Sequence, residues 1–127
     1  MPVGSAFRER RDETITETTD DVSAVVLSFT LGEEKIATIE VKGVSYDSGM
    51  TTGATGKITG TFARRTGQNI IRVGTPLLQA VTTTWSAPQP TLDVVANTQT
   101  QSIDIVVKGK AATYIRWYLK ALVEETA

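Results

Sequence analysis

Apolar and polar residues alternate with a period of two through most of the chain after residue 22. Successive side chains of a β-strand point to opposite faces of a sheet, so this alternation predicts half-buried strands. The clearest segments are residues 24–31, 35–42, 57–62, 92–96 and 102–108. In each of them one face is apolar and is expected to face a core.

The segment 113–125 fits two patterns. Strand alternation sets one group of apolar residues on a single face: Ile115, Trp117, Leu119, Ala121 and Val123. A helical spacing selects a different group: Ile115, Tyr118, Leu119, Leu122 and Val123. We favour a strand, because a glycine turn and two short strands precede the segment.

Turn signals separate the strands every 8–15 residues and set the expected fold class. Residues 47–56 form the longest expected loop, residues 65–69 a hairpin turn, and Ile71 and Val73 start its return strand. Gly43 predicts a bulge or bend. The pattern as a whole predicts an all-β domain: an antiparallel β-sandwich or jelly roll of about eight strands.

Residues 1–21 are expected to form an extended N-terminal arm, and residues 22–127 the β-sandwich domain. The arm is rich in charge and threonine, and Phe7 and Ile15 are its only large apolar residues between Val3 and Val22. Such a segment cannot bury itself, so we expect it to lie on its own domain or on a neighbouring chain.

The amino-acid composition narrows the classes of function that the sequence allows. Thr, Val and Ile make up 43 of 127 residues, and these β-branched side chains favour strands. The chain has no His and no Cys, which removes the commonest general base, the thiol nucleophile and the usual zinc ligands. The net charge of −1 argues against a nucleic-acid partner, and no apolar run is long enough to span a membrane. We therefore expect no enzyme activity, cofactor or metal.

Two weak signals of chemistry fail on spacing. Gly53 to Lys57 lacks the first Gly of a phosphate-binding loop and the hydroxyl residue that follows its Lys. The doublets Glu33-Glu34 and Glu124-Glu125 would point to opposite faces of a strand. An active site would have to bring together separate carboxylates such as Glu33, Glu40, Asp93 and Asp104.

The candidate functional residues are arginines and aromatic residues that suit protein interfaces. The candidates for a partner interface are Phe7, Arg8, Arg10, Arg11, Arg64, Arg65, Tyr114 and Tyr118. Tyr46 and Trp85 are candidates for stacking on a ligand, and Trp117 is expected in the core.

Parts of the sequence resemble a small β module of tailed-phage structural proteins, over about residues 18–124. The resemblance rests on Thr18-Thr19 and on four later segments: Phe62-Ala63-Arg64-Arg65-Thr66-Gly67, Arg72-Val73-Gly74-Thr75, Leu92–Ala96 with Ile103–Gly109, and Ile115-Arg116-Trp117. It implies a virion component with a structural or adhesive role.

A small β domain with an arm resembles a capsid decoration (cement) protein more than a fibre protein with a long shaft. The expected partner is then the major capsid protein or another virion protein, and the expected state is a homodimer or homotrimer in the virion, assembled after synthesis in the host cytoplasm. The alternative is a tail- or head-fibre module that recognises a host glycan or protein.

Overall fold

The computed structural model describes the backbone of residues 7–126 and their side chains except those of residues 78–82. Nine strands follow one another: β1 (Phe7–Thr18), β2 (Ser23–Thr30), β3 (Lys35–Tyr46), β4 (Gly53–Arg64), β5 (Ile71–Arg72), β6 (Leu77–Thr83), β7 (Thr91–Asn97), β8 (Ser102–Lys108) and β9 (Ile115–Thr126). All their pairings are antiparallel. The predicted all-β class is confirmed.

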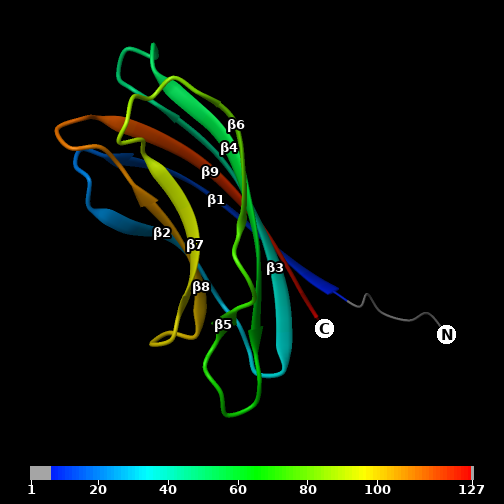
Figure 1. The fold of residues 1–127 in the computed structure, drawn as a ribbon. Helices are drawn as coiled ribbons and strands as arrows, with labels where there is room; N and C mark the ends of the chain where they lie inside the picture. Colours follow the sequence, from blue (N-terminus) through cyan, green and yellow to red (C-terminus); the bar gives the residue numbers. More distant parts are fainter. Residues whose placement is uncertain (1–6, 127) are drawn as a thin grey trace.

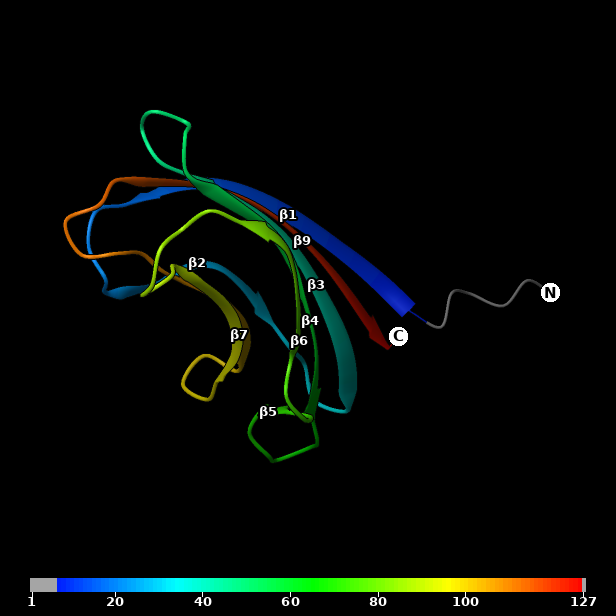
Figure 2. The same cartoon turned by 45° about the horizontal axis from the view of Figure 1, so that its top comes forward.

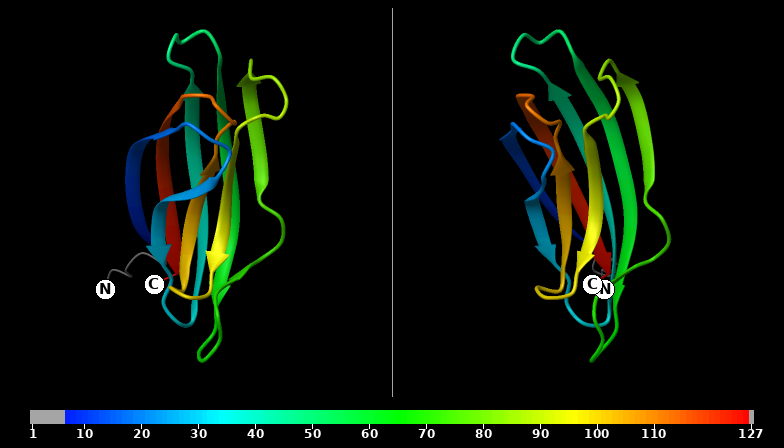
Figure 3. Two further views of the ribbon diagram at one scale, coloured as in Figure 1. Left: turned by 90° about the vertical axis from the view of Figure 1, so that its left-hand side faces the viewer. Right: turned by 60° about the vertical axis from the view of Figure 1, so that its left-hand side comes forward.

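The strands form two sheets that face each other as a β-sandwich (Figure 1). The large sheet has the order β1-β9-β3-β4-β5, with β6 also paired to β4, and the small sheet has the order β2-β8-β7. The large sheet curves around the small one, so its outer face is convex (Figure 2). The two side views show the small sheet against one face of the large sheet (Figure 3).

The core lies between the sheets and follows the alternation of the sequence. The apolar residues of β9 selected by the strand pattern are 0–4% exposed, so 113–125 contains a strand and not a helix. Ala37, Ile39 and Val41 of β3 and Ile103, Ile105 and Val107 of β8 are also buried. Burial of these side chains drives the two sheets together.

In two segments, the residues that face the core differ from those that the alternation predicts. The register between β2 and β8 shifts between Val25 and Leu27, a β-bulge that leaves Val25 56% exposed while Phe29 remains buried. In the hairpin after β4, Ile70 is buried and Ile71 is 57% exposed, so the core residue lies one position earlier than expected.

Of the bulge or bend predicted at Gly43, the bulge is wrong. Strand β3 pairs with both β4 and β9 through Gly43 without a shift in register. A Cβ atom at this position would lie 3.0 Å from Leu119 and 3.1 Å from Leu92. The glycine therefore permits close packing of the two sheets.

The loop expected at 47–56 is shorter, because β4 begins at Gly53. Asp47 closes this loop: its carboxylate accepts hydrogen bonds from the backbone N–H groups of Thr51 and Thr52 at 2.8 and 3.2 Å. These bonds, with Thr52 first, lower the pKa of Asp47 from its ordinary value.

The described part of the expected arm is a strand of the sandwich. β1 pairs with β9 from Phe7 to Thr18 without interruption. Its last residue, Thr18, is buried and accepts a hydrogen bond from the indole Nε1 of Trp117 at 3.0 Å. The segment is thus extended and lies on its own domain, which is one of the two placements expected for it, and residues 21 and 22 fall between two strands of one sandwich.

Candidate functional site

The outer face of the large sheet is exposed along β1, β3 and β9. Only the inner face packs against the small sheet (Figure 2). The register places six of the ten exposed large hydrophobic residues on the outer face: Phe7, Ile15, Ile36, Ile71, Leu77 and Tyr118. Such a concentration of apolar side chains is typical of interaction surfaces.

A tyrosine pair lies at one end of this face. The rings of Tyr46 and Tyr118 stack with centroids 5.7 Å apart and planes 20° apart, and the Tyr46 hydroxyl donates to that of Tyr118 at 3.1 Å. This hydrogen bond raises the pKa of Tyr46. The guanidinium of Arg116 lies 5.6 Å from the centre of the Tyr118 ring, a cation–π distance. The pair is therefore a fixed aromatic surface.

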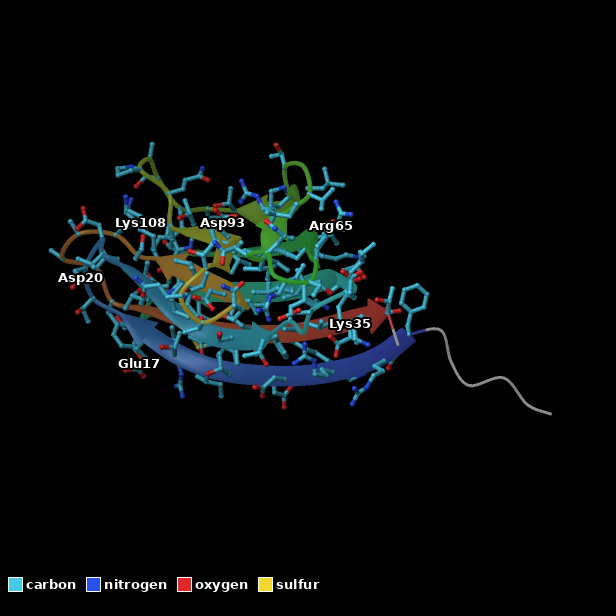
Figure 4. All side chains as sticks on the ribbon, turned by 90° about the horizontal axis from the view of Figure 1, so that it is seen from below. Glu17, Asp20, Lys35, Arg65, Asp93 and Lys108 are labelled. Carbon is cyan, nitrogen blue, oxygen red and sulfur yellow. The ribbon has the colours of Figure 1, made fainter. Side chains whose placement is uncertain are left out.

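Tyr114 lies beside this pair but is held by its own contact. Its hydroxyl donates to the Glu17 carboxylate at 2.9 Å, and this bond raises the pKa of Tyr114. Glu17 belongs to β1 and lies near one end of the sandwich, opposite the end that carries Lys35 (Figure 4). The contact fastens the end of β1 to the start of β9.

A surface groove of about 610 Å³ adjoins Tyr118. Its lining includes Glu13, Ile15, Lys42, Val44, Tyr118 and Lys120. Lys42 lies directly opposite both Lys120 and Lys57 in the register. Lys57 pairs with Glu40 at 3.2 Å, but neither Lys42 nor Lys120 makes an ion pair with a described residue.

Opposed like charges cost stability in a sheet. Glu13 lies opposite Lys120 and also lines the groove, so the site combines one carboxylate with two lysines beside an aromatic ring. The excess of positive charge suits an anionic group. The sequence analysis missed this pair. Lys42 and Lys120 are far apart in the chain, and only the register of β3 with β9 brings them together.

The structure separates the candidate arginines into two groups. Arg10 points toward the inner side of β1, where it lies 3.4 Å from Glu125, donates to the carbonyl of Thr30 at 2.6 Å and lies 5.6 Å from the centre of the Phe29 ring. It closes the side of the sandwich and keeps a 33% exposed side chain, so its assignment as a partner contact stays a prediction. Arg8 and Arg11 remain exposed, and Arg11 pairs with Glu9 at 3.3 Å.

Arg64 and Arg65 likewise differ in how far their side chains are exposed. Arg64 donates to the carbonyls of Leu31 and Gln68 at 3.1 and 3.2 Å and has a 21% exposed side chain, so its role is internal. Arg65 lies exposed in the turn after β4 (Figure 4). Of the two, only Arg65 keeps the exposure that a partner contact needs.

The two candidates for ligand stacking, Trp85 and Tyr46, also differ in their exposure to solvent. Trp85 is 8% exposed, belongs to the core and donates from Nε1 to the Ser45 hydroxyl at 3.0 Å. Its ring is therefore not available to a ligand, because the segment after β6 buries it in the core. Tyr46 is half-buried and reaches the surface as half of the tyrosine pair.

The carboxylates considered for catalysis each have separate partners. Glu33 lies 3.8 Å from Arg64, Glu40 pairs with Lys57, and Asp93 lies 3.9 Å from Arg72. Asp104 is buried and accepts hydrogen bonds from three neighbours: Ser28, Asn97 and Ser102. Among residues 7–126 no group of three or more acidic residues is placed to hold a metal ion.

Within the same residues, no helix has the length and hydropathy needed to cross a membrane. No family model matches the sequence, and no curated protein matches it. Among solved structures, the chain is similar to the tailspike protein of Acinetobacter baumannii phage AM24, with 10% identity and a TM-score of 0.47. The similarity covers 93% of this chain and 26% of the tailspike, so this chain spans about a quarter of that protein's length.

Proposed function

We propose that this chain is a non-enzymatic structural protein of a phage virion, and that it binds the major capsid protein or another virion protein as a decoration (cement) protein. The observation that carries the proposal is the outer face of the large sheet, with its six exposed hydrophobic side chains. The resemblance to phage structural modules in the sequence supports the virion context.

A sheet face suits this role physically. Backbone hydrogen bonds already hold the strands, so binding orders few additional residues and loses little conformational entropy. Ile15, Ile36 and Tyr118 come from three different strands, β1, β3 and β9, and so present one broad surface. The docking element is thus the large sheet, which includes β1; the sequence suggested contact through the arm together with the sandwich.

Purified particles provide the test. Mass spectrometry of density-purified virions from the genome that encodes this chain is expected to detect it, and immunogold labelling is expected to place it on the head. Its absence from particles, with abundant protein left in the lysate, would refute the virion role. Labelling confined to the tail would refute decoration.

Matched variants test the surface. Ile15→Glu and Ile36→Glu place charge on the outer face, and we expect each to reduce incorporation into particles at least fivefold. Val22→Glu is the control, because Val22 is 65% exposed and lies outside the large sheet. Equal incorporation of all three variants would exclude the outer face as the docking surface.

One observation favours a second function, a receptor-binding module that recognises a host glycan. The Tyr46–Tyr118 pair adjoins the groove that contains Lys42 and Lys120. An exposed aromatic ring can stack on a sugar, and lysines attract a sugar carboxylate or sulfate. This combination indicates an acidic saccharide as the ligand.

A glycan array separates this function from decoration. Receptor binding predicts hits among acidic glycans that disappear in Tyr118→Ala and weaken in Lys42→Gln. Lys108→Gln is the control, since Lys108 is exposed at the end of β8 in the small sheet. An array without hits that depend on Tyr118 would exclude this second function.

A further inference from the structure

Strand β1 is an edge of the large sheet. Among the described residues its partner strand is β9, and no strand pairs with its other side. The N–H of Glu13 is bonded to the side chain of Asp12 at 2.8 Å, so it points away from β9. Because backbone groups alternate along a strand, the odd-numbered residues of β1 present their N–H and C=O groups at this edge.

The charges along the start of this edge are self-complementary. Arg8-Glu9-Arg10-Arg11-Asp12 reads plus, minus, plus, plus, minus. When the strand is paired antiparallel with a copy of itself about Arg10, Arg8 lies opposite Asp12 and Glu9 opposite Arg11. The two-fold symmetry repeats both contacts, which gives four pairs of opposite charge.

We propose that two copies of this chain associate through antiparallel pairing of their β1 strands, with the two-fold axis at Arg10. The two large sheets then form one continuous sheet. This inference goes beyond the proposed function and does not depend on it.

The other registers are less favourable. An axis at Arg11 places Glu9 opposite Glu13 and Arg11 opposite itself, and like charges directly opposite are destabilising. An axis at Asp12 keeps Arg11 opposite Glu13 but places Arg8 and Arg10 opposite threonines. The axis at Arg10 is also the one that sets the edge groups of Glu9 against those of Arg11 in a hydrogen-bonded pair.

Arg10 itself does not oppose this arrangement. Each guanidinium already lies against Glu125 of its own copy and donates to the carbonyl of Thr30. The two positive charges at the axis are therefore compensated from within. In the paired state the edge N–H of Glu13 gains a backbone acceptor, which releases the Asp12 carboxylate to meet Arg8 of the second copy.

Charge exchange tests the proposal with the full chain. Light scattering and sedimentation velocity are expected to show a dimer that weakens as salt is added. Glu9→Arg alone and Arg11→Glu alone each turn two attractive contacts repulsive, and each is expected to weaken the dimer about tenfold. The double variant exchanges the charges and is expected to restore it.

The folding of these variants can be checked separately. The side chains of Glu9 and Arg11 are 53% and 61% exposed, so substitution leaves the core intact. Equal melting temperatures of the single and double variants would show that the change lies in association. A charged edge can also keep strands apart, so a chain that is monomeric at high concentration overturns the proposal. A dimer that the double variant fails to restore also overturns it.

A cysteine scan tests the register. The chain has no Cys, so one introduced residue gives an unambiguous cross-link. Residue 10 would occupy a non-hydrogen-bonded pair at the axis, with Cα atoms about 4.5 Å apart, which permits a disulfide. Oxidation is expected to cross-link Arg10→Cys and to leave Thr16→Cys, on the same face of β1, monomeric. Stronger cross-linking of Arg11→Cys than of Arg10→Cys would overturn the register.

Discussion

Substitution of Gly109 by alanine should release the end of β1 from the sandwich. A Cβ atom at this position would lie 2.5 Å from the Thr18 hydroxyl, 2.6 Å from the carbonyl oxygen of Asp20 and 2.9 Å from the Thr18 Cβ. These distances are far below van der Waals contact, and one of the atoms belongs to the backbone. The residues around Thr18 must therefore move.

The cost has two parts. Overpacking of this kind costs about 2 kcal/mol. Movement of Thr18 also removes the acceptor of the buried Trp117 indole N–H, which adds about 1 kcal/mol. We therefore expect a loss of about 3 kcal/mol in the free energy of unfolding. With an unfolding entropy of about 0.27 kcal/mol/K for a chain of this length, the melting temperature falls by about 11 °C.

Thermal and urea unfolding, followed by circular dichroism, measure this loss. Gly32→Ala is the matched control, because a Cβ there meets no atom closer than the Lys35 side chain at 3.8 Å. Thr18→Ala removes the clashing hydroxyl and the hydrogen bond, and leaves the close approaches of the residue 18 Cβ and the Asp20 carbonyl. We therefore expect the double variant Thr18→Ala with Gly109→Ala to lose less stability than the sum of the two single losses.

Two results would refute this reasoning. If Gly109→Ala and Gly32→Ala melt at the same temperature, the close approach at Gly109 does not hold β1. If the losses of the two single variants are additive, the destabilisation does not act through Thr18.

Three further predictions follow from single side chains. Trp85→Phe removes the hydrogen bond to Ser45 and should cost about 1–2 kcal/mol in urea unfolding, whereas an unchanged value would place that indole in water. Asp104→Ala leaves three donors without their acceptor, of which the Ser102 hydroxyl is buried, and should cost about 2 kcal/mol, with Asp104→Asn between it and the wild type; equal stability of all three would contradict the network. The lowered pKa of Asp47 means that its contribution to stability is present above the ordinary pKa of an aspartate and is lost as the pH falls through the lowered value. NMR titration should show this carboxyl protonating below a free aspartate, and Asp47→Asn should remove the dependence.

The surface that we propose for docking was only partly visible in the sequence. The sequence analysis selected Tyr118 and Tyr46, but under different functions, since their contact depends on the register of β3 with β9. It left out Ile15 as an interface residue and gave no role to Lys42. No local pattern marks these residues, because an exposed isoleucine in a charged strand has the same sequence signature in a tail as in a sheet.

The sequence alone determined that β3, β8 and β9 are strands and which of their faces are buried. Alternation in β3, β8 and β9 is a local property, because each residue's face follows from its neighbours'. Tertiary structure decided the pairing of β1 with β9, the bulge that exposes Val25 and the burial of Trp85. These features depend on segments distant in sequence. The free energy of their contact is set by packing between strands, which a period of two does not encode.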